Sequence, residues 1–455
     1  MNAASIQAFS TSLGGRVFSP DHPQFNTMAG VHQLAVTGRP ALVARPGSPG
    51  DVARAIAFAR EHALEIAVRC GGHSVAGHST GDGVLVIDLR DFRGLQVEPG
   101  GRRLRAGAGL TAGEVAAAAH GHGMTVPFGD TASVGIAGIT LGGGIGYLTR
   151  KVGMTIDHLV SVELVTADGR LVTASAESEP ELFWAVRGGG GNFGVVTSFE
   201  YRLVDAGLVY GGCLLLPATW NVLRGIAPLA AAAPEDLTVI ADYMPAPPAP
   251  FVPEAMVGQP VVALLGVFSG DLARGEAAWA PFRALAKPIA DLVGPMPYPA
   301  VYRFTESASL PGPAVNRGIL LEAIDDGVVE TLRDAYASSP GVMTLLQIRV
   351  VGGAMARVPA DATAFAHRQA PVAVLALTRA ESAEAMPAAT AWADGVLARL
   401  RSRGVGAYSN FLEDEGEARV REAYPHSTYR RLAAAKAVWD PENVFRRNHN
   451  IRPAV

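Results

Sequence analysis

Two glycine-rich segments contain the residues best suited to hold a ligand against the main chain. The first is Gly71-Gly72-His73-Ser74, and the second runs from residue 134 to residue 146 with repeated glycines. Successive amides in a glycine turn can curl around an anion, and the missing side chains leave room for a wide, planar ligand. The imidazole of His73 would face such a ligand. A structural loop histidine and a tight glycine packing corner are the alternative interpretations.

Two motifs near these segments are incomplete. Gly144-Ile-Gly146 begins like a nicotinamide fingerprint, but Thr149 stands where the third glycine is required. The segment 72–77 is similar to the turn that carries a hydrolase serine, but Ala76 stands where that turn needs glycine. A nicotinamide site is therefore excluded, whereas a serine hydrolase using Ser74 stays open as an alternative.

The first glycine segment follows a predicted strand, in an order of strand, helix, strand, loop and strand. A helix is expected to begin at Ser48-Pro49, because serine caps helices and proline suits the first turn. Capping-box spacing predicts further helices from 111–114 and 178–181, and Asp168-Gly169 predicts a hairpin turn. The expected strands are 41–44, 66–69, 84–87, 159–166 and 171–174.

The second half of the chain has a different texture. From about residue 208, proline-rich connections alternate with long apolar strands such as 261–268 and 345–351, and this change predicts a second domain. Gln347 and Arg349 alternate along one of these strands and would project to the same face. They are either ordinary polar residues of a sheet surface or residues that orient a substrate.

Composition excludes several classes of protein. The 455 residues are 49% hydrophobic and 18% charged with a net charge of −4, which excludes a disordered chain and disfavours nucleic acid as a partner. Cys70 and Cys213 give no disulfide framework, and His120-Gly-His122 lacks a third ligand, so no metal site is predicted. Without an export signal or an apolar run of about 20 residues, we expect a cytoplasmic protein that crosses no membrane.

Taken together, the motifs resemble the berberine-bridge-enzyme branch of the vanillyl-alcohol-oxidase flavoproteins. The resemblance covers roughly residues 36–206 and 405–453, and its motifs are 68–74, 135–146, 148–157, 182–188, 191–197 and 440–451. It implies an α+β fold in which a two-subdomain FAD-binding domain receives an inserted substrate domain with an antiparallel sheet covered by helices. The expected domains are 1–206 for FAD binding, with 36–206 as its core, 207–411 for substrate binding, and 412–455 returning to the FAD domain.

The resemblance also implies how FAD is held. His73 matches the histidine that is bonded covalently to the flavin, and Thr131 occupies the place of a second, cysteine link in many relatives. FAD is therefore expected to be linked through His73 only, and we interpret Cys70 as a packing residue. Val134 falls where the family controls access of oxygen, and its small size is compatible with an oxidase. The remaining residues implied in FAD binding are Arg69, Gly71, Gly72, Ser74, Gly135, Gly138, Gly142, Gly143, Gly144, Gly194, Val196, Asn448 and Asn450.

The expected base is Tyr408, because Tyr408-Ser-Asn410-Phe411 resembles a family segment whose tyrosine accepts a proton. A free phenol has a pKa of about 10, so this role requires a cation or strong hydrogen bonds. Arg349 could supply the charge, and Gln347 or Arg349 could orient the substrate. Tyr147 and Arg150 are weaker candidates for the pocket wall, and a purely structural Tyr408 stays open.

The function implied by the resemblance is that of an FAD-dependent oxidase. A C–H next to oxygen or nitrogen of a sugar, alkaloid or secondary metabolite delivers a hydride to flavin N5, and O₂ reoxidises the flavin to give H₂O₂. The expected partners are a small-molecule substrate and O₂, with no nucleic acid and no membrane, and the oligomeric state stays open. Besides the hydrolase, the alternative is a flavin-binding protein without catalytic activity.

Overall fold

The computed structural model describes residues 1–14, 16–32, 38–305 and 313–454. Its N-terminal part contains a four-stranded sheet in the order β1-β2-β4-β3, in which β4 pairs in parallel with β2 and β3. The helix that joins β2 to β3 begins as predicted, with the Ser48 hydroxyl accepting a hydrogen bond from the Asp51 amide and Pro49 in the first turn. The elements are α1 (Ala3–Ser12), β1 (Val17–Phe18), α2 (Phe25–Ala29), β2 (Leu42–Ala44), α3 (Pro49–Glu61), β3 (Ile66–Arg69) and β4 (Leu85–Asp88).

A five-stranded antiparallel sheet follows, in the order β5-β6-β10-β8-β9. The predicted hairpin joins β8 to β9, and Gly169 takes a φ of 82° at its turn. Both hydrogen bonds of the predicted capping box are present between Thr111 and Glu114. The elements are β5 (Leu95–Glu98), β6 (Arg103–Gly107), α4 (Ala112–His120), β7 (Met124–Thr125), α5 (Ile136–Gly142), α6 (Thr149–Val152), η1 (Thr155–Asp157), β8 (Leu159–Val165), β9 (Leu171–Ser175), α7 (Pro180–Val186), β10 (Val195–Arg202) and β11 (Val204–Asp205).

The second predicted capping box is wrong. Helix α7 begins at Pro180 rather than after Ser178, and its N-cap residue Glu179 has a left-handed conformation without a side-chain capping hydrogen bond. A residue that precedes proline is disfavoured in the right-handed helical region. Pro180 therefore separates Ser178 from the helix, and the Ser-x-x-Glu spacing there has no capping function.

The sheet of the second half has nine strands, and its path is β15-β12-β14-β13-β18-β19-β17-β20 with β16 also paired to β12. All of these pairs are antiparallel. The strands are β12 (Leu208–Pro217), β13 (Leu237–Pro245), β14 (Pro260–Phe268), β15 (Ala290–Asp291), β16 (Gly294–Pro297), β17 (Ala314–Leu321), β18 (Met343–Val350), β19 (Val372–Arg379) and β20 (Gly404–Gly406).

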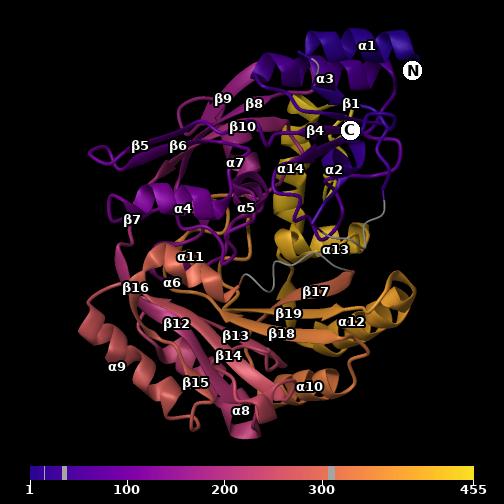
Figure 1. The fold of residues 1–455 in the computed structure, drawn as a ribbon. Coiled ribbons are helices and arrows are strands. Elements are labelled where there is room, and N and C mark those ends of the chain that lie inside the picture. The colour runs from indigo at the N-terminus through magenta and orange to yellow at the C-terminus, as the bar shows by residue number, and fades with distance from the viewer. Residues whose placement is uncertain (15, 33–37, 306–312, 455) are drawn as a thin grey trace.

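Each face of this sheet has its own apolar core. On β14, Leu264 packs with the helices, whereas Ala263 and Leu265 belong to a second cluster on the opposite face. Helices α8, α9, α10 and α12 lie on the outer side in Figure 1, and the N-terminal sheets lie on the other side. The remaining elements are α8 (Trp220–Ala232), η2 (Glu254–Met256), α9 (Leu272–Arg283), η3 (Tyr298–Phe304), α10 (Asp326–Ala337), α11 (Ala354–Arg357), η5 (Ala383–Ala385), α12 (Met386–Leu400), η6 (Arg401–Arg403), η7 (Ser409–Phe411), α13 (Glu417–Ala423) and α14 (His426–Trp439).

The end of the chain returns to the N-terminal sheets, and Figure 1 shows α14 and the C-terminus beside β4. The fully buried Lys436 ammonium donates hydrogen bonds to the Asp440 carboxylate at 2.7 Å and to the carbonyls of Asn192 and Phe445. The Asn192 side chain then accepts from the Ile451 amide at 2.9 Å. The mixed α+β architecture agrees with the predicted fold class, while the exact domain boundaries stay a prediction.

The described helices include none that is both long enough and apolar enough to span a bilayer. The longest of them, α12, has 15 residues, whereas a transmembrane helix needs about 20.

Lys436→Met is expected to lower the free energy of unfolding by about 3–5 kcal/mol, because Asp440 would keep a buried charge without its partner. Urea unfolding followed by circular dichroism measures the change. The control is Arg224→Met, whose ion pair with Asp326 is exposed and contributes at most about 1 kcal/mol. Equal losses in the two variants would contradict the importance of the buried pair.

Candidate functional site

His73 lies near the start of the loop between β3 and β4, directly after Gly72, which has a φ of 73°. Its imidazole stacks on that of His32, with ring centroids 3.9 Å apart and an interplanar angle of 22°. Burial and the neighbouring His32 together lower the pKa of His73 to about 4, although a hydrogen bond with the Ser133 backbone acts in the opposite direction. His73 is therefore neutral at pH 7, so one of its ring nitrogens keeps a lone pair.

The two glycine segments touch each other through their main chains. A Cβ atom added to Gly71 would lie 2.4 Å from the Gly135 nitrogen, and one added to Gly135 would lie 2.5 Å from the Gly71 nitrogen. Glycine is thus required on both sides of this contact. Gly138 differs, because a Cβ atom there would meet nothing within 4 Å. The start of α5 consequently faces open space.

Tyr408 and Asn410 occupy the space that side chains would take in the second glycine segment. A Cβ atom at Gly142 would lie 2.0 Å from Asn410 Oδ1, and one at Gly143 would lie 3.2 Å from Tyr408 Cε2. Gly143 and Gly144 also have φ values of 136° and 83°, which other residues rarely adopt. Gly142 to Gly144 therefore form a packing corner against the 408–410 segment.

The Tyr408 hydroxyl accepts two hydrogen bonds of 2.8 Å, from the Gly144 amide and from Asn410 Nδ2. Burial raises the pKa of Tyr408, whereas these two donors, the charge of Arg349 and a hydrogen bond with the Ile145 amide lower it. The site thus contains both the hydrogen bonds and the cation that stabilise a phenolate. Because burial is the largest influence, the phenol stays mostly protonated at pH 7.

Four polar side chains form a connected group, here termed the β13–β18 polar cluster: Asp130, Asp242, Gln347 and Arg349. The last three lie on β13 and β18. Gln347 donates to Asp242 Oδ1 at 2.8 Å, and Arg349 donates to the Gln347 side-chain oxygen at 2.5 Å and to Asp130 Oδ2 at 2.6 Å. Burial raises the pKa of Asp242 to about 6. Arg349 also lies 5.0 Å from the ring centroid of Phe411. The two predicted strand residues therefore do share a face, and they are buried rather than exposed on a sheet surface.

The two weaker candidates for the pocket wall differ in their surroundings. Tyr147 is fully buried and its hydroxyl has no hydrogen-bond partner among the described residues. Burial raises its pKa well above the usual range, and the charges of Asp130 and Asp242 add to this effect. Tyr147 is therefore close to the β13–β18 polar cluster. Arg150 instead donates hydrogen bonds to the carbonyls of Val351 at 3.2 Å and Ala233 at 2.8 Å, so it connects two separate backbone segments.

Four other predicted residues in or beside the glycine segments already have partners in the protein. Arg69 is buried, pairs with Asp88 at 2.9 Å and donates to the backbone carbonyls of residues 28 and 30. The Ser74 hydroxyl accepts from the His78 amide at 3.1 Å, and the Thr131 hydroxyl donates to Asp130 at 3.2 Å. Val134 is partly buried, and its carbonyl accepts from the Ala112 amide at 2.9 Å.

The thiol of Cys70 shows no sign of reactivity. Burial raises its pKa to about 12, and it packs against the apolar core of the N-terminal part. A thiol with so high a pKa is almost entirely protonated at pH 7 and is a poor nucleophile. This environment agrees with the interpretation of Cys70 as a packing residue.

The remaining predicted residues form two groups. Gly194 directly precedes β10 and Val196 lies near its start, whereas Asn448 and Asn450 lie near the end of the chain. Gly194 has a φ of 157° and fits closely against the Val165 carbonyl, and Val196 is buried in the core. The side-chain oxygens of Asn448 and Asn450 are buried and accept no hydrogen bond from the described residues. His78 Nε2 is likewise buried without a partner. Such buried polar groups require a ligand or water to satisfy them.

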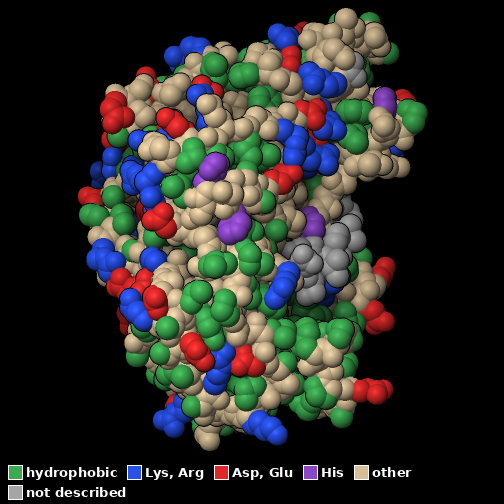
Figure 2. All heavy atoms as spheres, turned by 60° about the vertical axis from the view of Figure 1, so that its left-hand side comes forward, with side chains coloured by type: hydrophobic (Ala, Val, Ile, Leu, Met, Phe, Trp, Pro, Cys, Tyr) green, Lys and Arg blue, Asp and Glu red, His purple; other side chains and the backbone are tan. Residues whose placement is uncertain are grey.

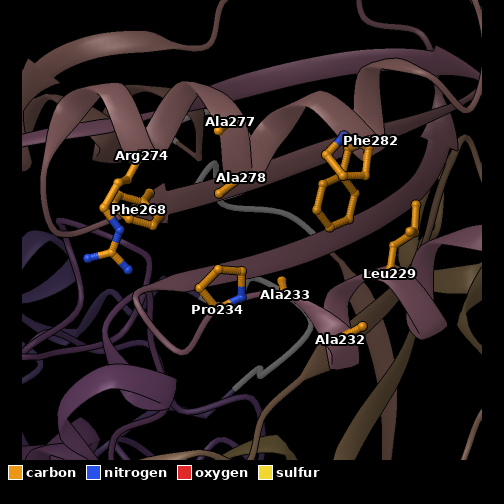
Figure 3. Close-up of a pocket in the computed structure, with 10 residues that line it drawn as sticks. Leu229, Ala232, Ala233, Pro234, Phe268, Arg274, Ala277, Ala278 and Phe282 are labelled. Atoms are coloured by element: carbon orange, nitrogen blue, oxygen red, sulfur yellow. The ribbon is translucent and has the colours of Figure 1, made fainter.

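An apolar hollow of about 370 Å³ lies between α8 and α9, on the helix-covered side of the nine-stranded sheet. Figure 3 shows Phe268, Phe282 and Leu229 around it, with Arg274 at one end. The predicted site residues are all absent from its lining, so it is separate from the site. On the face shown in Figure 2, acidic and basic side chains are interspersed, as expected for a net charge of −4.

Asp130, Asp242 and His32 were not predicted as site residues. Asp242 is a lone acid in the apolar strand Leu237–Pro245, and Asp130 is a lone acid beside the second glycine segment. An isolated charge in an apolar stretch was the available signal for both, because such a residue needs a specific partner. His32 carries no comparable signal, since its contact with His73 depends on the tertiary fold.

Known proteins match the chain over nearly its whole length. A family described as FAD binding domain matches residues 40–175, and a family described as berberine and berberine like matches residues 407–452. The chain is 33% identical to (R)-6-hydroxynicotine oxidase of Paenarthrobacter nicotinovorans, over 97% of either protein. It is 30% identical to an uncharacterized FAD-linked oxidoreductase of Bacillus subtilis (strain 168), over 97% of this chain and 98% of that protein.

Solved structures have the same fold. A crystal structure of 6-hydroxy-D-nicotine oxidase from Arthrobacter nicotinovorans has a TM-score of 0.86 and 29% identity and covers 96% of this chain and 98% of its own. Glucooligosaccharide oxidase from Acremonium strictum, described with a 6-S-cysteinyl, 8α-N1-histidyl FAD, has a TM-score of 0.87 and 22% identity over 99% of this chain and all of its own. Neither set of relatives supports the serine hydrolase, and the partners of Ser74 described above include no side-chain base.

Gly138→Ala is expected to separate stability from ligand binding. Alanine favours a helix over glycine by about 0.5–1 kcal/mol, and the added methyl group meets no protein atom, so the free energy of unfolding of the ligand-free protein should not fall. The flavin content of the purified protein, measured as its visible absorbance relative to its protein absorbance, should nevertheless decrease, because the methyl group intrudes into the open space.

The matched control is Gly395→Ala, a helical glycine of α12 whose added Cβ atom would also meet nothing within 4 Å. It should show the same change in stability and keep its flavin. If both variants retain flavin equally, the space at Gly138 is not part of the ligand site.

Proposed function

Because the chain belongs to the FAD-linked oxidoreductases that carry a berberine-like C-terminal segment, we propose that it is an oxidase of small organic substrates with O₂ as the electron acceptor. When bound, FAD would accept a hydride at N5 and then pass the two electrons to O₂. The net change removes a hydride and a proton from an H–C–O–H or H–C–N–H group, leaving C=O or C=N, and converts O₂ to H₂O₂.

The residues around the glycine segments fit an FAD. Gly138 leaves free space beside the main chain, and Asn448, Asn450 and His78 present buried polar atoms that lack partners in the protein. We assign residues 1–206 and 412–455 to the FAD-binding domain and 207–411 to the substrate domain. The buried contacts of Lys436 and Asn192 support this division, because they fix the chain end against the N-terminal part.

FAD is proposed to be linked through His73 alone. The neutral imidazole of His73 would hold the flavin through a bond from its free lone pair to the 8α carbon, and a hydrogen bond with the Ser133 backbone orients the ring. The new bond would replace an N–H of the imidazole and a C–H of the 8α methyl group, and O₂ would take up the two electrons and two protons released. At the place where relatives have a second link stands Thr131, whose hydroxyl is hydrogen-bonded to Asp130. Cys70 remains protonated and packed in the core. These surroundings favour one histidyl bond and no cysteinyl bond.

The observation that carries the proposal is the environment of the Tyr408 hydroxyl. It accepts hydrogen bonds from the Gly144 amide and Asn410, and Arg349 lies near enough to lower its pKa. A phenolate held in this way can take the proton from the substrate O–H or N–H while the adjacent C–H is oxidised. Arg349 acts through its charge, and Gln347 orients Arg349 by accepting its hydrogen bond.

His73→Ala is expected to fold and to bind FAD without a covalent bond. Trichloroacetic acid should therefore leave the flavin on the precipitated parent protein and release it from the variant. Peptide mass analysis of the parent should show one flavin adduct, on the peptide that contains His73. An adduct at Cys70, or flavin released completely from the parent, would overturn the single link.

Tyr408→Phe keeps the ring but removes the proton acceptor. The rate of anaerobic flavin reduction by a substrate should fall by about 10²–10⁴-fold, while substrate binding is preserved. Since burial raises the pKa of Tyr408, the parent rate should increase with pH across the neutral and alkaline range, and the variant should lose this dependence.

Reoxidation by O₂ serves as the control, because it does not use this proton transfer and should change little. An unchanged rate of reduction would place the base elsewhere. A parent flavin that no alcohol or amine reduces would instead favour a flavin-binding protein without catalytic activity.

A further inference from the structure

Asp242 lies on the face of the nine-stranded sheet that looks toward the glycine segments. It is directly opposite Gln347 in the pairing of β13 with β18, and Ile240 is opposite Arg349. Directly opposed residues in an antiparallel pair share a face. Asp242, Gln347 and Arg349 therefore project to the same side, away from the core formed with α8 and α10.

One oxygen of the Asp242 carboxylate has no partner. Oδ1 accepts the hydrogen bond from Gln347, whereas Oδ2 accepts none from the described residues. Oδ2 is not fully enclosed by protein atoms, and 7% of the surface of Asp242 is exposed. This oxygen therefore borders solvent-accessible space.

The charges of the β13–β18 polar cluster do not balance when Asp242 is ionised. The charged groups that act on Asp242 are Arg349 and Asp130, and Arg349 is already paired with Asp130 at 2.6 Å. Two carboxylates thus share one guanidinium. A buried carboxylate without a cation of its own is costly, and a bound cation would remove that cost.

Aliphatic side chains share the face of Asp242. In the pairing of β18 with β19, Leu375 is opposite Gln347 and Leu377 is opposite Leu345, so these side chains lie on that face. The neighbours of the carboxylate also include the Tyr147 phenol and the Cys213 thiol. A polyol needs a hydrogen-bond partner for each buried hydroxyl group, and leucine offers none. A carboxylate on a face that carries leucines suits an organic cation with an apolar body.

A series of contacts connects the proposed base, Tyr408, to Asp242. Tyr408 contacts Phe411 with ring centroids 4.9 Å apart, Arg349 lies over Phe411, and Gln347 connects Arg349 to Asp242. Tyr408 and Asp242 are thus distinct positions linked through three intervening side chains, so one substrate could place a different group at each.

We propose that Asp242 is a specificity-determining residue that binds a cationic nitrogen of the substrate, and that the substrate is an organic cation with an apolar body whose charged nitrogen is separate from the carbon being oxidised. This inference rests on the proposed oxidase function, which places the oxidation beside Tyr408.

Isothermal titration of the flavin-loaded protein with benzamidine and with benzamide tests the proposal. The two compounds have nearly the same shape, but only benzamidine is a cation, and neither has a C–H next to a nitrogen or oxygen that the flavin could oxidise. The parent should bind benzamidine at least about tenfold more tightly, as expected for a hydrogen bond between charged groups. Asp242→Asn should abolish this preference and leave benzamide affinity unchanged.

The control variant is Glu413→Gln, which removes another buried carboxylate, paired with Arg317 at 2.6 Å, and should keep the preference. A further measurement needs no variant. Because burial raises the pKa of Asp242 to about 6, benzamidine affinity should fall as the pH drops through and below that value, while benzamide affinity stays constant. The groups facing this carboxylate are Gln347, Arg349, Asp130 and Tyr147.

Equal affinity for the two compounds in the parent, including no binding of either, would overturn the proposal, and so would a preference that persists in Asp242→Asn. Failure of the oxidase function is recognised separately, because it appears as a flavin that no substrate reduces under anaerobic conditions. Calorimetric binding does not depend on that reduction.

Discussion

The site depends on the contact between a glycine corner and the segment that begins at Tyr408. Side chains at Gly142 or Gly143 would occupy the positions of Asn410 and Tyr408, so the corner must be bare for the phenol to reach the main chain. The same approach lets the Gly144 amide donate to the phenol oxygen. The glycine corner and the segment at Tyr408 thus form one unit, although Gly144 and Tyr408 are 264 positions apart in the chain. The hydrogen bonds to the Tyr408 hydroxyl come from one backbone amide and one amide side chain, that of Asn410.

A second unit opposes this corner from the nine-stranded sheet. Asp130 comes from the glycine-rich part of the chain, and its ion pair with Arg349 connects that part to β18. The pair is largely buried, with 15% of the Asp130 side chain and 8% of the Arg349 side chain exposed, so solvent screens it weakly. The pair fixes the guanidinium near the Tyr408 phenol. The distance between this cation and the phenol is therefore set by the packing of two distant parts of the chain.

Much of the local structure could be predicted, because its causes lie within a few residues. Ser48-Pro49, the Thr111 capping box and the Asp168-Gly169 turn all formed where expected. The Ser178 capping box failed because Pro180 changes the conformation of the residue before it. His73, Tyr408 and the strand bearing Arg349 could be singled out from motifs and periodicity. Among their partners, Asp130 and Asp242 could be noticed only as isolated acids. Their pairing with Arg349 and Gln347, like the contact of His32 with His73, arises only from tertiary packing.

The order of the chain has a consequence for its synthesis. The apolar core around the N-terminal sheets contains Phe9 at one end of the chain and Ile451 at the other. A ribosome therefore releases both glycine segments long before it makes Tyr408 and the tail that completes this core. Domains fold as units during translation, but this part must wait for the residues near Ile451. A nascent or prematurely terminated chain consequently carries the glycine segments without the tyrosine that packs against them.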